Sequence, residues 1–118
     1  MAERNITYLS EANIITCVVE NGLAEGILNA AKNTGAQGAT ISYGRGTGIR
    51  ERMGLLGVTI DEQKEVIRII VSEEQADRVF EAMYLAGGLD TPGKGIMFMT
   101  KLDRVATYIP QDVLKQIA

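Results

Sequence analysis

The 118-residue sequence contains no histidine, no tryptophan and only one cysteine, Cys17. The absence of histidine removes the commonest general base and the commonest side-chain ligand of transition metals. A lone cysteine builds no structural zinc site, and a nucleophilic serine or cysteine would lack its usual histidine base. Cys17 itself stands within an apolar run, where we expect a buried, unreactive thiol. The composition therefore predicts no catalytic residues, no metal site and no enzymatic activity.

Long apolar stretches and an excess of basic residues are missing as well. No run approaches the roughly 18 apolar residues that a membrane-spanning helix needs, and the first residues lack the pattern of a secretory signal. The formal net charge of −3 disfavours nucleic acid as a partner, because nucleic-acid-binding proteins usually present a basic face. A single cysteine excludes an intramolecular disulfide and fits a reducing compartment. We expect a cytoplasmic protein of one domain, residues 1–118.

The chain does contain β-branched runs that alternate with helical patterns. Strands are expected at residues 13–19, 39–43, 65–71 and 95–100, with a further short one at 105–109. Between the first two, apolar residues recur at helical spacing after Asn21, a candidate N-cap, and before Gly35, a helix stop. A second helix is expected from a capping box at Ser72–Gln75 to Gly87. This order predicts an α+β, ferredoxin-like βαββαβ sandwich.

In such an architecture the two helices cover one face of the sheet, and its other face stays bare. Strands rich in β-branched residues on both sides would then face water, so we expect a homo-oligomer to cover them. An N-terminal extension, residues 1–12, precedes the domain. The C-terminal tail, residues 110–118, keeps apolar residues at 113, 114 and 117, which suit either a short helix docked on a neighbour or a frayed end.

A glycine-rich stretch, SYGRGTGIRERMGLLG at 42–57, separates two of the predicted strands. From residue 44 to residue 64 the sequence predicts no regular element, and a connection of that length in a compact domain is usually functional or disordered. Its glycines match neither the dinucleotide fingerprint nor the Walker spacing, but they suit an anion-binding nest of backbone N–H groups. Arg45, Arg50 and Arg52 add charge that suits phosphate or carboxylate.

A second turn, DTPGKGI at 90–96, repeats this pattern with Lys94 between Gly93 and Gly95. Taken alone, the first stretch also fits a loop without a role, and the second fits a plain helix-to-strand connection. Two glycine-rich turns that carry cations favour a shared anion site more than either turn does singly.

These motifs resemble those of the PII signalling family, and more closely its divergent PII-like branch. The resemblance runs from about residue 13 to residue 109 and is carried by TGAQGATIS leading into GRGTG, and by TPGKGIMFM. It implies a homotrimer in which residues 44–64 form the T-loop, which contacts partner proteins, and residues 89–95 form the B-loop. It also implies an adenine-nucleotide site in the cleft between subunits, completed by the neighbouring subunit's C-terminal segment.

The resemblance assigns roles to individual residues. Those implied to bind the nucleotide are Gly46, Thr47, Gly48, Ile70, Gly93, Lys94 and Gly95, with Ile70 at the adenine edge and the glycines at the phosphates. Further cations near the phosphates or another anion are Arg45, Arg50, Lys64 and Lys101. Partner contacts fall to the middle of the T-loop, at Arg52, Met53, Leu55 and Leu56. On this view a side chain at position 95 would occupy the phosphate position.

The sequence departs from the family pattern at the phosphate-binding cations. Ile96 stands in place of the B-loop lysine, and Thr107 and Ile109 stand in place of two C-terminal arginines. Fewer cations favour fewer phosphates, so the expected regulatory ligand is ADP or AMP rather than ATP, and no cofactor is expected. Arg50 replaces the glutamine that helps to bind magnesium and 2-oxoglutarate, and the loop has neither Tyr nor Ser for covalent modification.

Three functions are compatible with these patterns. The first is a PII-like regulator that binds ADP or AMP and acts through its T-loop on a partner, a membrane transporter or a metabolic enzyme. The second is a PII-like interaction module for another small anion, bicarbonate or a carboxylate, or for no ligand. The third is a purely structural ferredoxin-like trimer, similar to the divalent-cation-tolerance family, or an unsuspected enzyme. We further expect the T-loop to be disordered without ligand, because its glycines make ordering costly.

Overall fold

The computed structural model describes residues 4, 6–46 and 62–108. Along the chain the elements are β1 (Tyr8–Leu9), β2 (Ala12–Glu20), α1 (Ala24–Asn33), β3 (Thr40–Gly46), β4 (Glu62–Ser72), α3 (Glu73–Ala86), β5 (Gly95–Leu102) and β6 (Val105–Ala106). The predicted disorder of the T-loop, residues 44–64, is wrong at residues 44–46 and 62–64, which belong to β3 and β4. The rest of that loop, and the C-terminal tail 110–118 for which a short helix and a frayed end were both open, lie outside the described residues.

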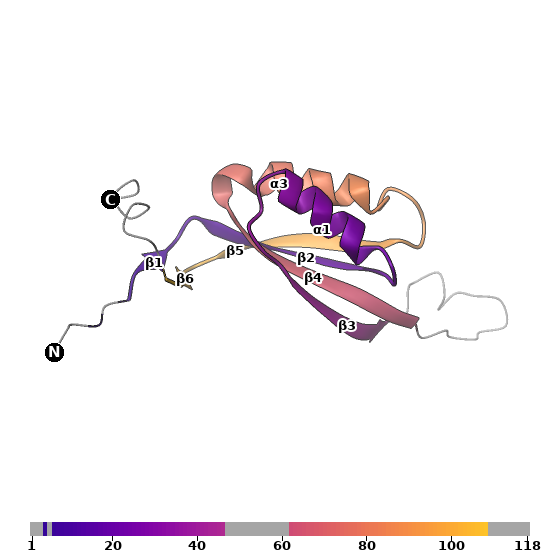
Figure 1. Cartoon of the computed structure of the whole chain (residues 1–118), viewed down its shortest axis with the longest axis horizontal. Helices are drawn as coiled ribbons and strands as arrows, with labels where there is room; N and C mark the ends of the chain where they lie inside the picture. Colours follow the sequence, from indigo (N-terminus) through magenta and orange to yellow (C-terminus); the bar gives the residue numbers. More distant parts are fainter. Residues whose placement is uncertain (1–3, 5, 47–61, 109–118) are drawn as a thin grey trace.

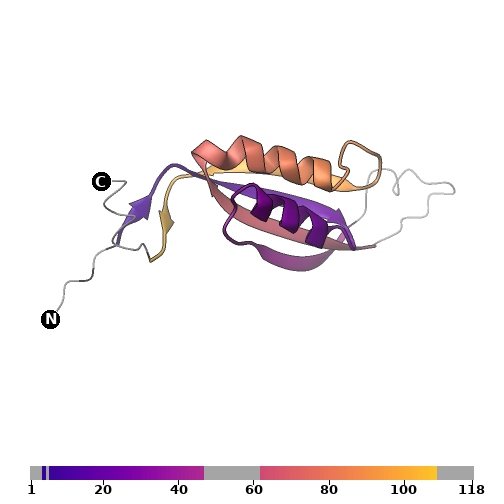
Figure 2. The ribbon, with the colours of Figure 1, turned by 45° about the horizontal axis from the view of Figure 1, so that its top comes forward.

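β2, β3, β4 and β5 form one antiparallel sheet in the order β3-β4-β2-β5. Both helices lie on the same face of this sheet, as Figure 1 and the rotated view in Figure 2 show. The order β2-α1-β3-β4-α3-β5 is the βαββαβ arrangement that the sequence predicts, so the predicted fold class is confirmed.

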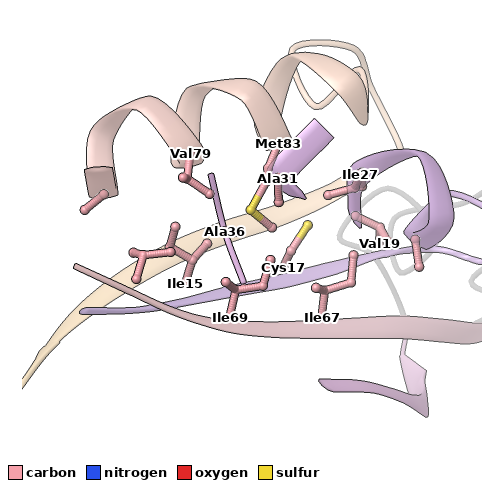
Figure 3. Packing of buried hydrophobic residues seen from close by; sticks show 13 residues of the cluster. Ile15, Cys17, Val19, Ile27, Ala31, Ala36, Ile67, Ile69, Val79 and Met83 are labelled. Atoms are coloured by element: carbon pink, nitrogen blue, oxygen red, sulfur yellow. The ribbon is translucent and has the colours of Figure 1, made fainter. Parts of the chain in front are cut away.

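The hydrophobic core lies between the helices and the sheet (Figure 3). Alternate residues of the two central strands point into it, because side chains of a strand alternate between the two faces. These are Ile15, Cys17 and Val19 of β2 and Ile67, Ile69 and Val71 of β4. They pack against Ile27 and Ala31 of α1 and Val79 and Met83 of α3. Full burial of each large aliphatic side chain is worth about 1.5–3 kcal/mol, so this single layer holds both helices on the sheet.

The opposite face of the sheet carries the alternate residues of its strands. Both helices of the described residues lie on the other face (Figure 1). Three large apolar side chains there are strongly exposed: Ile70 at 51%, Ile96 at 62% and Phe98 at 49%. Register places them on that face, since Val18 pairs with Ile96, Thr16 with Phe98 and Ile14 with Ile70, whereas Ile15, Cys17 and Val19 enter the core. We call Ile70, Ile96 and Phe98 the open-face apolar residues.

The N-terminus of α1 differs from the prediction. Asn21 is not its N-cap; Leu23 holds that position and makes no side-chain capping bond. The backbone N–H groups of Gly22 and Ala24 instead donate to the Glu65 carboxylate, at 2.5 Å and 3.1 Å. A carboxylate from β4 therefore caps this helix, with favourable charge against the helix dipole.

The start of α3 is predicted correctly in position but not in its hydrogen bonds. Ser72 is the N-cap residue, yet its hydroxyl makes no capping bond, so the predicted capping box does not form. The first N–H of the helix, that of Glu73, donates to the backbone carbonyl of Glu11 at 3.0 Å. At the other end Gly87 is the C-cap, as predicted.

The glycine-rich connection is shorter than predicted, because both its ends belong to strands. Gly44, Arg45 and Gly46 continue β3 and pair with Lys64, Gln63 and Glu62 of β4. Neither glycine adopts a positive φ, so the predicted anion nest does not form at Gly44 and Gly46. Pairing with a long β-branched strand outweighs the low strand preference of glycine here.

The N-terminal segment contains a short strand of its own. β1 pairs with β6, near the end of the described chain, in a separate two-stranded sheet. The Arg104 guanidinium lies over the Tyr8 ring, 4.9 Å from its centroid. Figure 1 shows this pair of strands beside the main sheet, at the end opposite residues 44–46.

Candidate functional site at the loop end of the sheet

One end of the four-stranded sheet gathers the two glycine-rich segments. β3 ends there at Gly46, β2 ends at Glu20, and β5 begins at Gly95. In register Glu20 stands opposite Lys64, and Val19 stands opposite Gly95. We call this edge the loop end of the sheet. Antiparallel pairing thus brings together two motifs that lie about fifty residues apart in sequence.

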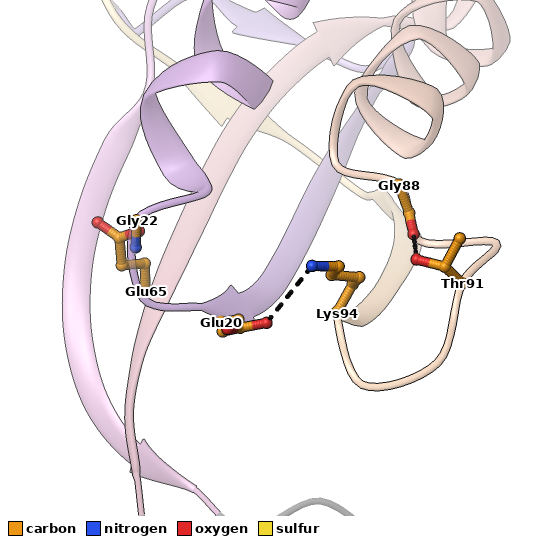
Figure 4. Close-up of polar contacts among 6 residues, drawn as sticks. All are labelled: Glu20, Gly22, Glu65, Gly88, Thr91 and Lys94. Carbon is orange, nitrogen blue, oxygen red and sulfur yellow. Dashed lines mark hydrogen bonds and ion pairs between the residues drawn. The ribbon is translucent and has the colours of Figure 1, made fainter.

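The turn from α3 into β5 is fixed by backbone and hydroxyl contacts. Thr91 donates to the carbonyl of Gly88 through its N–H at 2.9 Å and through its hydroxyl at 2.5 Å (Figure 4). Gly93 adopts a φ of +81°, a left-handed conformation that glycine accepts without steric cost. The backbone N–H of Glu20 donates to the carbonyl of Lys94 at 2.9 Å. The turn is therefore tied to the last residue of β2.

Gly95 is required by the close approach of β5 to β2. Its φ is +152°, and an added Cβ would lie 2.3 Å from the carbonyl oxygen of Val18 and 2.8 Å from Cα of Val19. A side chain at position 95 would thus collide with the β2 backbone. The expectation that it would occupy the phosphate position is wrong, because the Cβ direction leads into the neighbouring strand. At Gly93, by contrast, an added Cβ meets nothing within 4 Å.

The loop end carries cations with a nearby carboxylate. The Lys94 ammonium lies 3.9 Å from the Glu20 carboxylate, and Figure 4 shows the two side chains turned toward each other. Both are about half exposed, at 41% and 46%. Lys64 and Arg45 stand on the adjoining β4 and β3. An added Cβ at Gly46 would lie 3.1 Å from Cγ of Lys64, so the lysine stem crosses close over this glycine.

A shallow, open cavity of about 360 Å³ lies beside these strands, lined by Tyr43, Gly44, Arg45 and Gln63. Its lining combines an exposed aromatic ring with a guanidinium, the pair of groups that stacks on planar ligands and binds anions. The cavity borders the base of the predicted T-loop.

Two of the predicted site residues lie elsewhere in the chain. Ile70 is six positions beyond Lys64 along β4, about 20 Å at the usual strand rise. Lys101 stands near the far end of β5, where its ammonium lies 3.8 Å from the Glu73 carboxylate. Within one chain, then, Gly46, Lys64, Gly93, Lys94, Gly95 and Arg45 share the loop end, and Ile70 and Lys101 do not.

The remaining predicted site residues fall outside the described residues. These are Thr47, Gly48 and Arg50 of the nucleotide and anion set, and Arg52, Met53, Leu55 and Leu56 of the partner-binding set. Ile109 is outside as well, and Thr107 is described and exposed. Among the described residues no group of three or more acidic, cysteine or histidine side chains is placed to hold a metal ion. Neither helix in that part of the chain has the length and apolar content for crossing a membrane.

Sequence reasoning did not identify two carboxylates that shape this end of the sheet. Glu65, only 9% exposed, fixes α1 to β4, and Glu20 pairs with Lys94. Their partners lie 41 or more residues away in the chain. No local pattern reports such contacts; only the strand pairing would have placed Glu20 beside both lysines.

Comparison with known proteins identifies the family to which this chain belongs. A family model described as Nitrogen regulatory protein P-II matches residues 12–111. The chain belongs to the P-II family. P-II proteins are signalling regulators, so the resemblance seen in the two glycine-rich motifs is confirmed at the level of the family. A search of curated protein sequences finds no significant match.

Solved P-II structures share the fold. The Arabidopsis thaliana PII protein bound to citrate is 18% identical, with a TM-score of 0.62 over 80% of this chain and 79% of that one. The B. subtilis GlnK–ATP complex is 19% identical, with a TM-score of 0.65 over 80% of this chain and 84% of that one. At such low identity the likeness concerns the backbone, and the ligand chemistry of this P-II chain has to be argued from its own residues.

Proposed function

We propose that this P-II chain is a cytoplasmic regulator that binds ADP or AMP at the loop end of the sheet. The bound nucleotide would set the state of the T-loop, through which the protein acts on a transporter or a metabolic enzyme. The proposal rests on one observation above all: β-sheet pairing brings the B-loop turn, with Gly93 and Lys94, to the same edge as the T-loop base, with Arg45, Gly46 and Lys64.

The charges at this edge favour a ligand with few phosphates. Lys94 already pairs with Glu20 at 3.9 Å, and position 96 holds an exposed isoleucine. Thr107 follows β6 at the other end of the chain, so a neighbouring subunit would bring it to this edge. Where the family resemblance implies an arginine, it adds no charge. Each charge-assisted hydrogen bond to a phosphate is worth about 1.5–3 kcal/mol, so a second and third phosphate gain less here than in a site with more cations.

A homotrimer would complete the site. The open-face apolar residues need a cover, and a second copy of the same sheet face is the simplest one, because most soluble homo-oligomers have closed symmetry. In the resulting cleft a neighbouring subunit would supply the adenine contacts that a single chain does not gather at the loop end. Ile70 would then contact the adenine only of a nucleotide bound at the loop end of a neighbouring subunit.

Isothermal titration calorimetry with AMP, ADP and ATP tests the proposal. We expect ADP or AMP to bind at least as tightly as ATP. Lys94→Ala should weaken the binding of ADP more than that of AMP, since the lysine would contact the outer phosphate. Lys32→Ala, which removes an exposed lysine from the last turn of α1, is the matched control and should change neither. If ATP with magnesium binds about tenfold more tightly than ADP, a difference of about 1.4 kcal/mol, the proposed preference is wrong.

A carboxylate is the second candidate ligand. It is favoured by the pairing of Lys94 with Glu20, which reduces the positive charge of the B-loop turn, and by the citrate in the Arabidopsis thaliana PII structure, which shares this fold. Citrate and bicarbonate belong in the same calorimetric series. Binding of either one without any nucleotide binding would replace the first candidate by the second.

A further inference from the structure

The carboxylate of Glu20 stands inside the cluster of cations at the loop end. Two contacts hold its residue there: the backbone N–H donates to the Lys94 carbonyl at 2.9 Å, and the carboxylate lies 3.9 Å from the Lys94 ammonium. In register Glu20 also stands directly opposite Lys64 on β4, with its side chain on the same face of the sheet. By strand order the negative charge of Glu20 on β2 thus stands between Lys64 on β4 and Lys94 at the start of β5.

We infer that Glu20 is a specificity-determining residue that limits the charge of the anion bound at the loop end. The inference deepens the proposed function and rests on it, because it assigns the preference for few phosphates to a residue of this chain. Glu20 offsets the charge of Lys94, with which it pairs, and repels the outer phosphates of a bound nucleotide. The cost rises with each phosphate, because each one adds negative charge near the carboxylate.

The repulsion between the Glu20 carboxylate and a bound phosphate is large enough to measure. Two unit charges 4 Å apart change an equilibrium constant by about fivefold in bulk water and by more near a protein surface. Glu20 and Lys94 are each about half exposed, so the interaction is screened but close enough to matter. A phosphate that binds Lys94 must also displace its existing partner, which adds to the cost for ADP and ATP.

A purely structural role for Glu20 would produce a different result. The bond that ties β2 to the B-loop turn uses the backbone N–H of Glu20, not its side chain. Glu20→Gln removes the charge and keeps both the shape and that bond. The variant should therefore fold with unchanged stability, and any change in ligand preference reports the carboxylate alone.

The test is calorimetry of AMP, ADP and ATP on the intact chain, on Glu20→Gln and on Glu74→Gln. The last variant makes the same change of net charge at an exposed position in the first turn of α3, far from the loop end. We expect Glu20→Gln to raise the affinity for ATP at least about fivefold and that for AMP less than about twofold. Glu74→Gln should leave both affinities unchanged. Glu20→Thr, which keeps a good strand former at this position, should repeat the result.

The outcomes separate this inference from the function on which it rests. If the intact chain binds nucleotides but the ATP-to-AMP affinity ratio is the same in Glu20→Gln, the inference is wrong and the proposed function stands. An equal gain in Glu74→Gln would also overturn it, because the effect would then be one of net charge. If no nucleotide binds to any variant, the proposed function fails and the inference fails with it. A smaller gain from Glu20→Gln in a Lys94→Ala background would support the pairing mechanism, and an equal gain would overturn it.

Discussion

Gly95 and Gly93 stand two positions apart, and the structure gives them different tasks. At Gly95 an added Cβ would lie 2.3 Å from a β2 carbonyl oxygen, whereas at Gly93 it would meet no atom within 4 Å. The first glycine allows β5 to pair with β2, and the second only allows the turn its left-handed φ of +81°. Gly93 is therefore the position at which substitution probes the ligand site rather than the fold.

This difference predicts two unfolding free energies. Gly95→Ala should lower the free energy of unfolding by about 3 kcal/mol or more, because backbone atoms of β2 have to move. Gly93→Ala should lower it by only about 1–2 kcal/mol, the cost of a left-handed conformation for a residue with a Cβ. Urea denaturation of both variants measures the two values. Equal losses would contradict the assigned roles.

Cys17 illustrates what burial does to a single side chain. It is fully buried between β2 and the helices, and desolvation of the thiolate raises its pKa from 9.0 to about 11. We expect the folded protein to resist thiol reagents at pH 8 and to react with one equivalent once urea unfolds it. Rapid labelling of the native protein at pH 8 would show that the thiol is accessible.

The same raised pKa makes stability depend on alkaline pH. The unfolded thiol ionises from about pH 9 and the folded one only near 11, so the unfolded state binds fewer protons in this window. The contribution of Cys17 to the free energy of unfolding is thus complete below pH 9 and is lost as the pH rises toward 11. Cys17→Ala, which has no thiol to ionise, should show a flatter profile over this range when the two are compared by urea denaturation.

At the scale of elements, Glu65 links β4 to α1. Its carboxylate accepts from the N–H groups of Gly22 and Ala24, so Glu65→Ala leaves two donors at the helix N-terminus without a partner. We expect a loss of about 1–3 kcal/mol in the free energy of unfolding, with a smaller loss for Glu65→Gln, which keeps an acceptor oxygen. Glu25→Ala, an exposed acidic residue in the first turn of the same helix, is the control.

That control separates capping from a general charge effect. An exposed charge near a helix N-terminus contributes at most about 1 kcal/mol, so Glu25→Ala should cost clearly less than Glu65→Ala. Chemical denaturation at one pH measures all three variants. Similar losses for Glu25→Ala and Glu65→Ala would mean that the hydrogen bonds of Glu65 add nothing beyond its charge.

The helices and strands also show how much of the fold can be predicted from the sequence. Periodicity predicts the two helices and the four strands of the main sheet, because apolar spacing follows directly from which face each element buries. It places the end of β3 wrongly at Tyr43, since glycines at 44 and 46 look like a loop until their pairing with β4 is known. It misses the cap on α1 for the same reason: Asn21 is the local candidate, but Glu65 reaches the helix from a strand 41 residues away. The sequence thus predicts features that depend on neighbouring residues, but not contacts that depend on how the strands pair.

The candidate site depends even more strongly on register. The sequence alone identifies Gly93, Lys94 and Arg45 by their residue types, and the structure brings them to one edge. It does not reveal that Lys94 has Glu20 as a partner, or that Lys101 pairs with Glu73 at the other end of the sheet. Counting cations along the sequence therefore overstates the charge available to a ligand.

At the scale of the whole molecule, the open-face apolar residues are the ones that we expect to control the proposed assembly. Ile96 is 62% exposed in the single chain, and Leu85 on α3 is 69% exposed, so either can be replaced without disturbing the core. They lie on opposite sides of the molecule, since α3 covers the other face of the sheet (Figure 1). A glutamate at each position therefore tests whether that surface forms the interface between subunits.

We expect Ile96→Glu to convert the proposed homotrimer into monomers and Leu85→Glu to leave it intact. Three carboxylates brought together in a dry interface would each lose hydration without a partner, which costs several kcal/mol per charge, whereas a carboxylate on the helix surface stays in water. Sedimentation velocity at micromolar concentration measures both variants beside the unmodified protein. If the unmodified protein is a monomer, the proposed trimer and the proposed cleft between its subunits are both wrong. Dissociation by Leu85→Glu but not by Ile96→Glu would place the interface on the helices, and the nucleotide site would then have to be completed within one chain.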